Sequence, residues 1–401
     1  MCLTRLRLPV TGSFVTLLLS CLLLLFGTGS QAFAKTSKAD NQSDGHVYVL
    51  NNNLGSPNSI TVFNREEDGS LSLSGVTSIG GTGSIAAFAD GTQGSLILTS
   101  DDTRLFAADA GSDQISVINV RNGHLSLVNV AFSGGAGPIS LTYRNGLLYV
   151  LNAANGSAVT ASVTGFRVDA SGRLYPIAGS TKALSTTHPN PAQVQIDPSG
   201  HYLLVTEKAT NLIDVYRIHE DGSLSNPTSF SSVGVYPFGF AFNPARPQEL
   251  IVDDGFGTGN GIGAVTAYQL SHGNVNLING PVLDNQIAPC WMVVTRDGHY
   301  AYTSNADSHT ISGYGIANNG VISSLNANGV TASTPTDTFP IEEGLSSDSY
   351  YLYVLESRLL LKQPGPATLG GFAIHSDGSL TSVVDPSQIT LPFSAIGLAA
   401  S

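Results

Sequence analysis

The sequence predicts an all-β fold, a seven-bladed β-propeller of four-stranded blades. Three observations lead to this prediction. Glycine is abundant, at 44 of 401 residues, and only 11% of residues are charged, so the residues that favour long helices are scarce. A sequence motif of short apolar strands recurs about every 50 residues, with a turn glycine at a fixed position in each copy. Four short strands per unit of this length is the pattern of a propeller blade.

The repeated motif consists of an apolar strand, a strand in which apolar and polar residues alternate, and a hairpin glycine that precedes a third strand. In the first copy these parts lie at residues 47–51, at residues 60–63 and at Gly69. Glycine adopts positive φ at no steric cost and therefore suits tight turns. The hairpin glycines of successive copies are Gly69, Gly123, Gly172, Gly222, Gly273, Gly320 and Gly378. We therefore expect seven blades.

A further strand precedes the motif in most copies, and it is expected to be the innermost strand of its blade. It is recognised at residues 138–143, 192–197, 237–242, 289–294 and 340–345. A stretch of the same kind lies near the last residue, at 391–398, whereas the first copy starts at Val47 with what is elsewhere the second strand. Because pairing protects sheet edges, we expect the C-terminal strand to complete the N-terminal blade and close the ring. Residues 46–401 would then form one propeller domain.

The first 34 residues have the pattern of a secretory signal peptide. Arg5 and Arg7 precede an apolar run over residues 10–26, and residues 32–34 form an Ala-x-Ala cleavage site. An uncleaved membrane anchor is the alternative interpretation of this segment. Residues 35–45 are polar and are expected to form a flexible tether. We therefore expect an exported protein, secreted or held at the cell envelope, with no membrane span after signal cleavage.

Composition excludes several classes of partner. The formal net charge of −12 gives no support for nucleic-acid binding, which needs clustered Lys and Arg. The sequence has no HExxH, CxxC, phosphate-loop or nucleophile-elbow motif, so no cofactor and no metal are expected. Asp253 and Asp254 leave calcium as a weak alternative. Glycine-rich stretches at residues 80–94 and 255–263 are interpreted as insertions between strands, and a monomer is expected.

The blade pattern also indicates where function would lie. Strands alternate in direction, so the short hairpin turns gather on one face of the ring and the remaining loops on the other. Loops on a rigid framework commonly carry function, and we expect a site in the central funnel of that second face. Carboxylates there would bind a polar substrate or transfer protons. The catalytic candidates are Glu207, Asp254, Glu342 and Glu343. The substrate-binding candidates are His188, Asn190, Lys208, Asp253, Glu356 and Arg358.

Each candidate also has a structural interpretation. Carboxylates at strand ends are often solvated or bound to loop amides, and a lone loop histidine such as His188 is often only exposed. Cys290 next to Trp291 is interpreted as a packed pair near the funnel mouth, because no histidine lies beside it in the sequence to activate the thiol.

The chain resembles the seven-bladed lactonase family. The resemblance is carried by His188-Pro189-Asn190-Pro191, by residues 196–207 and by residues 215–218, and it extends over about residues 46–401. This family includes 6-phosphogluconolactonase-like proteins and carboxymuconate-lactonizing enzymes. The resemblance implies a seven-bladed propeller that acts on a small polar lactone.

The sequence departs from the family pattern at two inner strands. Where family members often have Pro-His-Pro-His, this chain has Pro189-Asn190-Pro191-Ala192, and where many have Pro-Arg-His it has Pro237-Phe238-Gly239. Asp254 matches an acid that often follows in the family. Two hypotheses remain open: an exported lactone hydrolase or cycloisomerase, and a non-catalytic extracellular propeller that binds a protein or cell-envelope partner. The second hypothesis is supported by short motifs such as residues 48–51, which resemble surface-layer propeller repeats.

Overall fold

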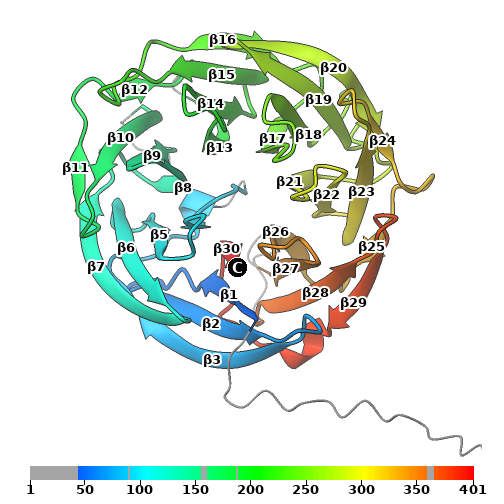
Figure 1. Cartoon of the computed structure of the whole chain (residues 1–401), viewed down its shortest axis with the longest axis horizontal. Helices are drawn as coiled ribbons and strands as arrows, with labels where there is room; N and C mark the ends of the chain where they lie inside the picture. The colour runs from blue at the N-terminus through cyan, green and yellow to red at the C-terminus, as the bar shows by residue number, and fades with distance from the viewer. Residues whose placement is uncertain (1–43, 89–90, 155–159, 187, 359–364) are drawn as a thin grey trace, which may run out of the picture. The chain divides into compact units, whose positions relative to one another are not determined.

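The computed structural model describes residues 44–88, 91–154, 160–186, 188–358 and 365–401, which belong to one compact unit. The expected signal peptide and nearly all of the expected tether lie outside the described residues. Within them, seven antiparallel sheets are arranged in a ring (Figure 1). Five sheets have four strands, and the third and sixth blades add a short fifth strand. The prediction of an all-β, seven-bladed propeller is confirmed.

The blades follow one another along the chain, apart from the first, which takes strands from both ends. The first blade comprises β30 (Leu398–Ala400), β1 (Gly45–Leu50), β2 (Ser59–Arg65) and β3 (Leu71–Ser78). The second comprises β4 (Leu96–Leu98), β5 (Arg104–Asp109), β6 (Gln114–Arg121) and β7 (His124–Phe132). The third comprises β8 (Pro138–Arg144), β9 (Leu147–Asn152), β10 (Ser162–Val168), β11 (Leu174–Pro176) and β12 (Lys182–Ala183).

The remaining four blades repeat the same order from the inner to the outer strand. The fourth comprises β13 (Pro191–Ile196), β14 (Tyr202–Glu207), β15 (Leu212–Arg217) and β16 (Thr228–Ser231). The fifth comprises β17 (Pro237–Phe242), β18 (Glu249–Asp254), β19 (Ala264–Ser271) and β20 (Asn274–Leu283). The sixth comprises β21 (Pro289–Val294), β22 (Tyr300–Asn305), β23 (Thr310–Ile316), β24 (Ile322–Ser324) and β25 (Ala332–Ser333). The seventh comprises β26 (Phe339–Leu345), β27 (Tyr351–Ser357), β28 (Thr368–Ile374) and β29 (Leu380–Val384).

The ring is closed by the C-terminal strand, as expected, but this strand is shorter and later than residues 391–398. β30 pairs with β1 through Val47↔Ala400 and two neighbouring pairs, and Arg65 Nε donates to the carbonyl of Ser401 at 3.2 Å. Gly397 has a φ of +82°, so the chain turns there and only the last residues run beside β1. The residues before this turn include a short helix, η2 (Pro386–Gln388).

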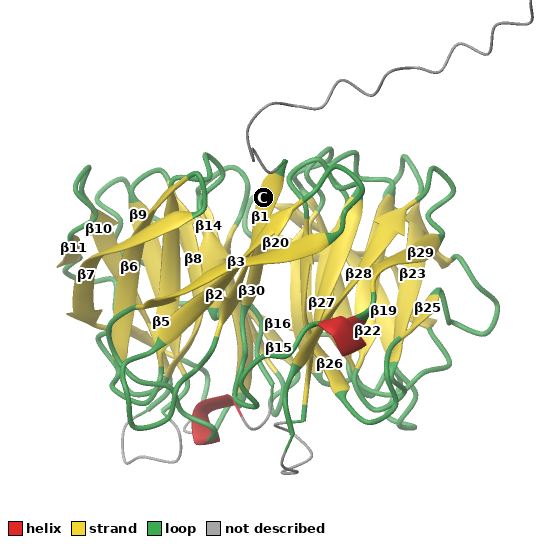
Figure 2. Cartoon of the chain, turned by 90° about the horizontal axis from the view of Figure 1, so that it is seen from below, coloured by secondary structure: helices red, strands yellow, loops and turns green. Residues whose placement is uncertain are grey.

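The ring has two faces (Figure 2). The hairpin face carries the turns between the first and second and between the third and fourth strands of the blades. A hairpin glycine serves two purposes there, as Gly378 illustrates. Its φ is +81°, and a Cβ atom on it would lie 2.6 Å from the ring of Tyr300 in the preceding blade. Gly273 meets Tyr202 in the same way, so these glycines allow neighbouring blades to approach.

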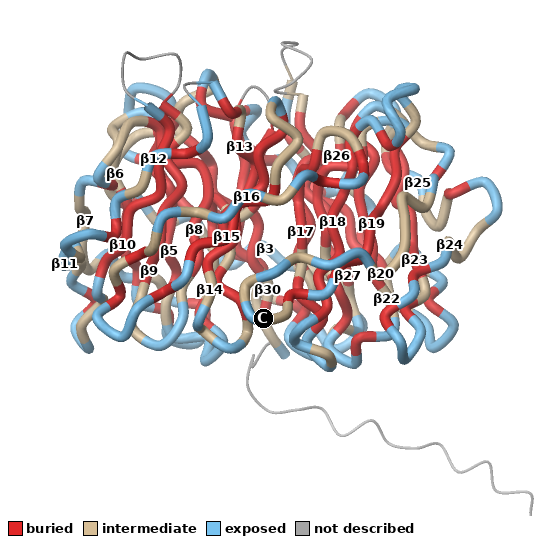
Figure 3. The backbone as a smooth tube through the Cα atoms, turned by 90° about the horizontal axis from the view of Figure 1, so that it is seen from above, coloured by how far each residue is buried: buried red, intermediate tan, exposed pale blue. Residues whose placement is uncertain are grey.

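The middle strands of the blades are buried on both sides, because a neighbouring blade covers each side. Figure 3 shows buried segments running through the body of the ring, with exposed segments at turns and outer strands. β5 and β9 have five consecutive buried residues each, whereas the outer strand β3 has none. A polar side chain on a middle strand is expected to have a hydrogen-bond partner, but the carboxyl groups of Asp214 and Asp253 are buried without one among the described residues.

Candidate functional site

The second strand of every blade runs to a buried Asn, Asp or Glu at the funnel face. These strand-end residues are Asn51, Asp109, Asn152, Glu207, Asp254, Asn305 and Glu356. Most of their side chains accept hydrogen bonds from hydroxyl groups on the third strand or on the segment that enters the same blade. Asp254, for example, accepts from Thr266 Oγ1 at 2.5 Å and from Ser232 Oγ at 3.3 Å. The shared position stabilises the funnel end of each blade.

Three predicted site residues, Glu207, Asp254 and Glu356, belong to this strand-end set. Glu207 accepts from the backbone N–H of Ser185 at 2.9 Å and from Thr210 Oγ1 at 2.5 Å. Burial raises the pKa of Asp254 and that of Glu356 to about 7, although hydroxyl donors oppose the shift. All three side chains are buried, and each lies in a different blade.

Glu342 and Glu343 lie on the inner strand β26 and are also buried, with 2% and 4% of their surface exposed. Neither carboxyl oxygen of Glu343 has a hydrogen-bond partner among the described residues, and burial raises the pKa of Glu343 to about 8. Burial likewise raises the pKa of Glu342 well above its ordinary value, although the backbone of Gly94 donates to it. Burial therefore opposes ionisation of both carboxyl groups.

Asp253 and Asp254 are consecutive residues of β18, so their side chains leave opposite sides of the sheet. Asp253 faces Thr303 of the next blade, and burial raises its pKa well above the ordinary value. A calcium ion bound by both carboxylates has no support from this arrangement. The described residues contain no group of three or more His, Cys, Asp or Glu side chains placed to hold a metal ion.

The remaining candidates are distributed around the funnel. Lys208 is 2% exposed, and its Nζ donates to the carbonyl of Gly91 at 2.8 Å and lies 4.5 Å from the ring centroid of Phe238. Asn190 Nδ2 donates to the hydroxyl of Tyr236 at 3.3 Å. The other two candidates are more accessible. His188 is exposed, and Arg358 forms an ion pair with Asp337.

A ring of apolar residues, which sequence reasoning did not identify as a set, lies at the centre. Four inner strands begin with a proline, and β26 has one as its second residue. Each of these prolines pairs with the strand-end residue of its blade, and the register shifts directly after it. Such bulges redirect a side chain. The residues that follow the prolines are Ile139, Ala192, Phe238, Cys290 and Ile341. All five are buried in one hydrophobic cluster, which we call the central ring. Its signal in the sequence is a proline followed by an apolar residue, repeated in five blades.

The segment between β3 and β4 enters the centre of the propeller. We call residues 86–88 and 91–95 the plug; it starts with the short helix η1 (Ala86–Phe88), which Figure 1 shows inside the ring. Phe88 is fully buried in the same cluster as the central ring. The carbonyl of Thr92 accepts from Trp291 Nε1 at 2.7 Å, and the N–H of Gln93 donates to the carbonyl of Ala192 at 3.3 Å. The insertion expected at residues 80–94 thus packs against inner strands of the fourth and sixth blades.

Cys290, a member of the central ring, has the environment of a packed thiol. It is 8% exposed, and its Sγ donates to the carbonyl of Ala288 at 3.0 Å. Burial raises the pKa of Cys290 well above its ordinary value, and Asp253 adds to this effect. Because the thiolate is the reactive form, this environment opposes nucleophilic reactivity.

These features define a seven-bladed propeller with an apolar, plugged centre. A family model described as "Lactonase, 7-bladed beta-propeller" matches residues 43–252, just over half of the chain. The chain belongs to this lactonase family.

Solved structures support the same fold. A periplasmic gluconolactonase from Pseudomonas aeruginosa is 16% identical, with a TM-score of 0.65 over 88% of this chain and 99% of that chain. A protein from Bacteroides fragilis, described as a candidate 6-phosphogluconolactonase, is 18% identical, with a TM-score of 0.67 over 90% and 99%. A protein from Lactobacillus plantarum is 15% identical, with a TM-score of 0.68 over 89% and 99%. Among curated proteins, no sequence matches this chain significantly.

The structure also bears on membrane-spanning helices. The described residues form only two helices, each three residues long. None of the helices in this part of the chain could cross a membrane.

Proposed function

We propose that this chain is an exported lactonase-family propeller that binds an extracellular or cell-envelope partner and does not open or close lactones. The observation that carries the proposal is the apolar central ring. The family resemblance places a histidine and an arginine at two of its positions, where this chain has Ala192 and Phe238. Neither side chain transfers a proton or stabilises an oxyanion, so the ring lacks the groups that lactone chemistry requires.

The burial of the acidic candidates supports the same proposal. A general acid or base needs to lie within hydrogen-bond reach of its substrate. Glu207, Asp254, Glu342 and Glu343 are each at most 4% exposed. Glu207 and Asp254 accept hydrogen bonds from hydroxyl or backbone groups of the propeller itself, whereas neither carboxyl oxygen of Glu343 has a partner among the described residues. For Glu207 and Asp254, burial together with these contacts is consistent with a structural role at the funnel end of a blade.

Lactone hydrolysis or cyclisation is the second candidate, and one observation favours it. Burial raises the pKa of Glu343 to about 8 and that of Asp254 to about 7, which places both near the pH at which acid–base catalysts work best. For this function the plug would have to move away, so that a small polar lactone could reach the inner strands.

The two candidates are distinguished by a turnover assay. Ring opening of glucono-δ-lactone and 6-phosphoglucono-δ-lactone is followed by proton release with the wild type, Glu343→Gln and the exposed control Glu220→Gln. We expect all three to match the spontaneous rate. An acceleration by the wild type that Glu343→Gln abolishes and Glu220→Gln retains would overturn the proposal and establish the second candidate.

Binding and export are tested separately. The purified protein is sedimented with isolated cell envelopes of its source, and we expect it to co-sediment in a saturable manner. Cell fractionation followed by N-terminal sequencing tests export, with a mature chain starting at Lys35 as the expected result. Protein that stays in the cytoplasm with an intact N-terminus would contradict export.

A further inference from the structure

A cleft on the hairpin face, between the sixth and seventh blades, has the size and lining of a ligand site. Its volume is about 720 Å³, within the range of roughly 300–1,000 Å³ that is usual for small-ligand pockets. Three turns line it: residues 295–300 before β22, residues 348–350 before β27 and residues 374–376 after β28. We call it the 6/7 cleft. It lies on the face opposite the funnel.

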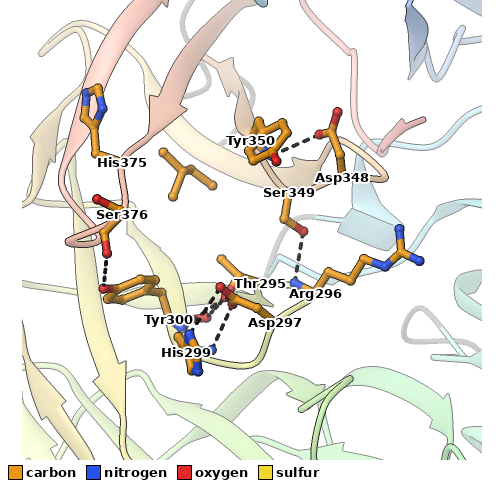
Figure 4. A pocket seen from close by; sticks show the side chains of 11 residues that line it. Thr295, Arg296, Asp297, His299, Tyr300, Asp348, Ser349, Tyr350, His375 and Ser376 are labelled. Atoms are coloured by element: carbon orange, nitrogen blue, oxygen red, sulfur yellow. Dashed lines mark hydrogen bonds and ion pairs between the residues drawn. The ribbon is translucent and has the colours of Figure 1, made fainter.

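Figure 4 shows the side chains of the 6/7 cleft around a common space, with Tyr350 and His375 on one side and Tyr300 and His299 on the other. Tyr350 is 66% exposed, although a large aromatic side chain gains stability from burial. The side chain of His299 is 58% exposed. The cleft therefore presents aromatic and imidazole groups to solvent.

The polar groups around this space are held in place. Tyr300 Oη donates to the carbonyl of Ser376 at 2.8 Å, which joins two of the three turns. The N–H of Arg296 donates to Ser349 Oγ at 3.0 Å, which joins the third. His299 Nδ1 lies 3.3 Å from a carboxylate oxygen of Asp297. Such fixed contacts reduce the entropy lost when a ligand binds.

Part of this lining recurs between the fourth and fifth blades, although Pro247 and Gln248 lie there and no counterpart of Tyr350 does. A second cleft of about 360 Å³ lies there, which we call the 4/5 cleft. The sequence Gly-His-Tyr occurs twice in the chain, at residues 200–202 and 298–300, and each copy lines one of the two clefts. The next blade supplies a second histidine to each, His272 in the 4/5 cleft and His375 in the 6/7 cleft. The two clefts therefore share a His-Tyr pair and a second histidine, and only the 6/7 cleft adds an exposed tyrosine, Tyr350.

The chemistry of the lining indicates the class of ligand. An exposed tyrosine ring offers a flat apolar surface with a polar edge, and a pyranose ring has one apolar face and a rim of hydroxyl groups. Imidazole, carboxylate and hydroxyl groups around the tyrosines donate to and accept from such a rim. The lining contains one permanent cation, Arg296, and two carboxylates, Asp297 and Asp348, so it does not favour an anionic ligand, whereas an uncharged ligand needs no opposite charge.

We propose that the 6/7 cleft binds an uncharged pyranose saccharide, with Tyr350 stacking on the ring and His299 bonding to its hydroxyl groups. The 4/5 cleft is a second, smaller site of the same kind. Two sites on one face would engage two units of one polysaccharide, which strengthens attachment through a high effective concentration. This inference rests on the proposed binding function and names its partner class.

The test is calorimetric titration of the full chain with three uncharged hexasaccharides: cellohexaose, maltohexaose and hexa-N-acetylchitohexaose. We expect at least one to bind, and Tyr350→Ala and His299→Ala each to weaken its affinity by about tenfold or more. Tyr175→Ala is the matched control, because Tyr175 is a half-exposed tyrosine on the outer strand β11 of the third blade. This variant should bind as the wild type does. His201→Ala should lower the number of sites and leave the 6/7 cleft active.

Two results would overturn the inference: no binding of any hexasaccharide, or binding that persists unchanged in a Tyr350→Ala, His299→Ala double variant. Thermal unfolding of each variant shows whether the fold is intact. The results that would contradict the proposed function differ from those that would contradict the cleft inference. Lactone turnover would contradict the proposed function without affecting the cleft, whereas saturable envelope binding by a chain that binds no hexasaccharide would keep the proposed function and reject the cleft.

Discussion

The side chain of Gln93 forms two hydrogen bonds with the backbone of Met292. Gln93 Nε2 donates to the carbonyl of Met292 at 2.7 Å, and the N–H of Met292 donates to Gln93 Oε1 at 3.0 Å. Gln93 lies in the plug, just before the second blade, whereas Met292 lies on β21, the inner strand of the sixth blade. The plug is therefore fixed across the centre of the ring by specific polar contacts as well as by the burial of Phe88.

Gln93→Ala should destabilise the propeller. The substitution leaves the N–H and the carbonyl of Met292 buried without these partners, and each unsatisfied group costs about 1–3 kcal/mol. We expect the free energy of unfolding in urea to fall by about 2 kcal/mol or more. Gln388→Ala, at an exposed glutamine, is the control and should be neutral. Equal stability of the two variants would show that the contact with Met292 contributes nothing.

The buried strand-end acids should make the protein less stable as the pH rises. Burial raises the pKa of Asp254 from 3.8 to about 7 in the folded chain. Between these values the folded chain keeps a proton that the unfolded chain releases, so the free energy of unfolding falls as the pH rises from about 4 to about 7, and then levels off. Each unit of pKa difference corresponds to about 1.4 kcal/mol.

Asp254→Asn should remove part of this pH dependence. Asparagine is the strand-end residue of three other blades, as Asn51, Asn152 and Asn305 show, so the position accommodates an amide. We expect the loss of stability between about pH 5 and pH 8 to be smaller in Asp254→Asn than in the wild type by at least about 1 kcal/mol. The measurement is urea unfolding at both pH values, with Glu220→Gln as the exposed control. Parallel pH dependences in all three proteins would refute the assignment.

Ring closure predicts a strong effect of C-terminal truncation. Deletion of residues 393–401 removes β30 and exposes the inner edge of β1, including the backbone groups of Val47 that pair with Ala400. We expect aggregation or a large drop in melting temperature, because an unpaired edge invites association between chains. Leu398→Arg in the full chain should have a similar effect, since Leu398 is buried, whereas Thr390→Arg, at an exposed position, should be neutral. An unchanged melting temperature on truncation would contradict closure.

The fold was predictable from the sequence because it depends on repetition. Each hairpin glycine indicates a turn between two strands. Seven such glycines at a similar spacing predict seven blades, and this prediction needs no knowledge of long-range contacts. The bounds of β30 were not predictable in the same way. Residues 391–398 are apolar like an inner strand, but the turn at Gly397 and the packing of the preceding segment depend on the closed ring. The inner strand of the second blade, β4, was missed because it has only three residues.

The site was less predictable, because burial depends on tertiary contacts. Glu207, Asp254 and Glu356 were selected as acids at strand ends, and the sequence alone does not show that hydroxyl groups of the same blade bind them. Phe238 and Ala192 were noticed as departures from a family pattern. Only the register shifts after the inner-strand prolines show that both residues belong to one central ring. A bulge leaves little trace in a sequence beyond the proline itself.

Removal of the Phe88 side chain tests the role of the plug as core. Phe88 is fully buried, and Phe→Ala changes at such positions cost about 3–5 kcal/mol, because they lose transfer free energy and leave a cavity. Phe256→Ala is the matched control. Phe256 is 44% exposed and its ring is tilted against that of Tyr236 with a centroid distance of 4.7 Å, so its loss should cost less than about 1 kcal/mol. Both costs are measured by urea unfolding.

Because the plug packs at the centre of the ring and the 6/7 cleft lies between two blades on the hairpin face, Phe88→Ala should leave saccharide affinity unchanged at temperatures where the variant is folded. If the plug were instead a mobile lid over an active site, Phe88→Ala would cost little stability and would produce lactone turnover that the wild type lacks.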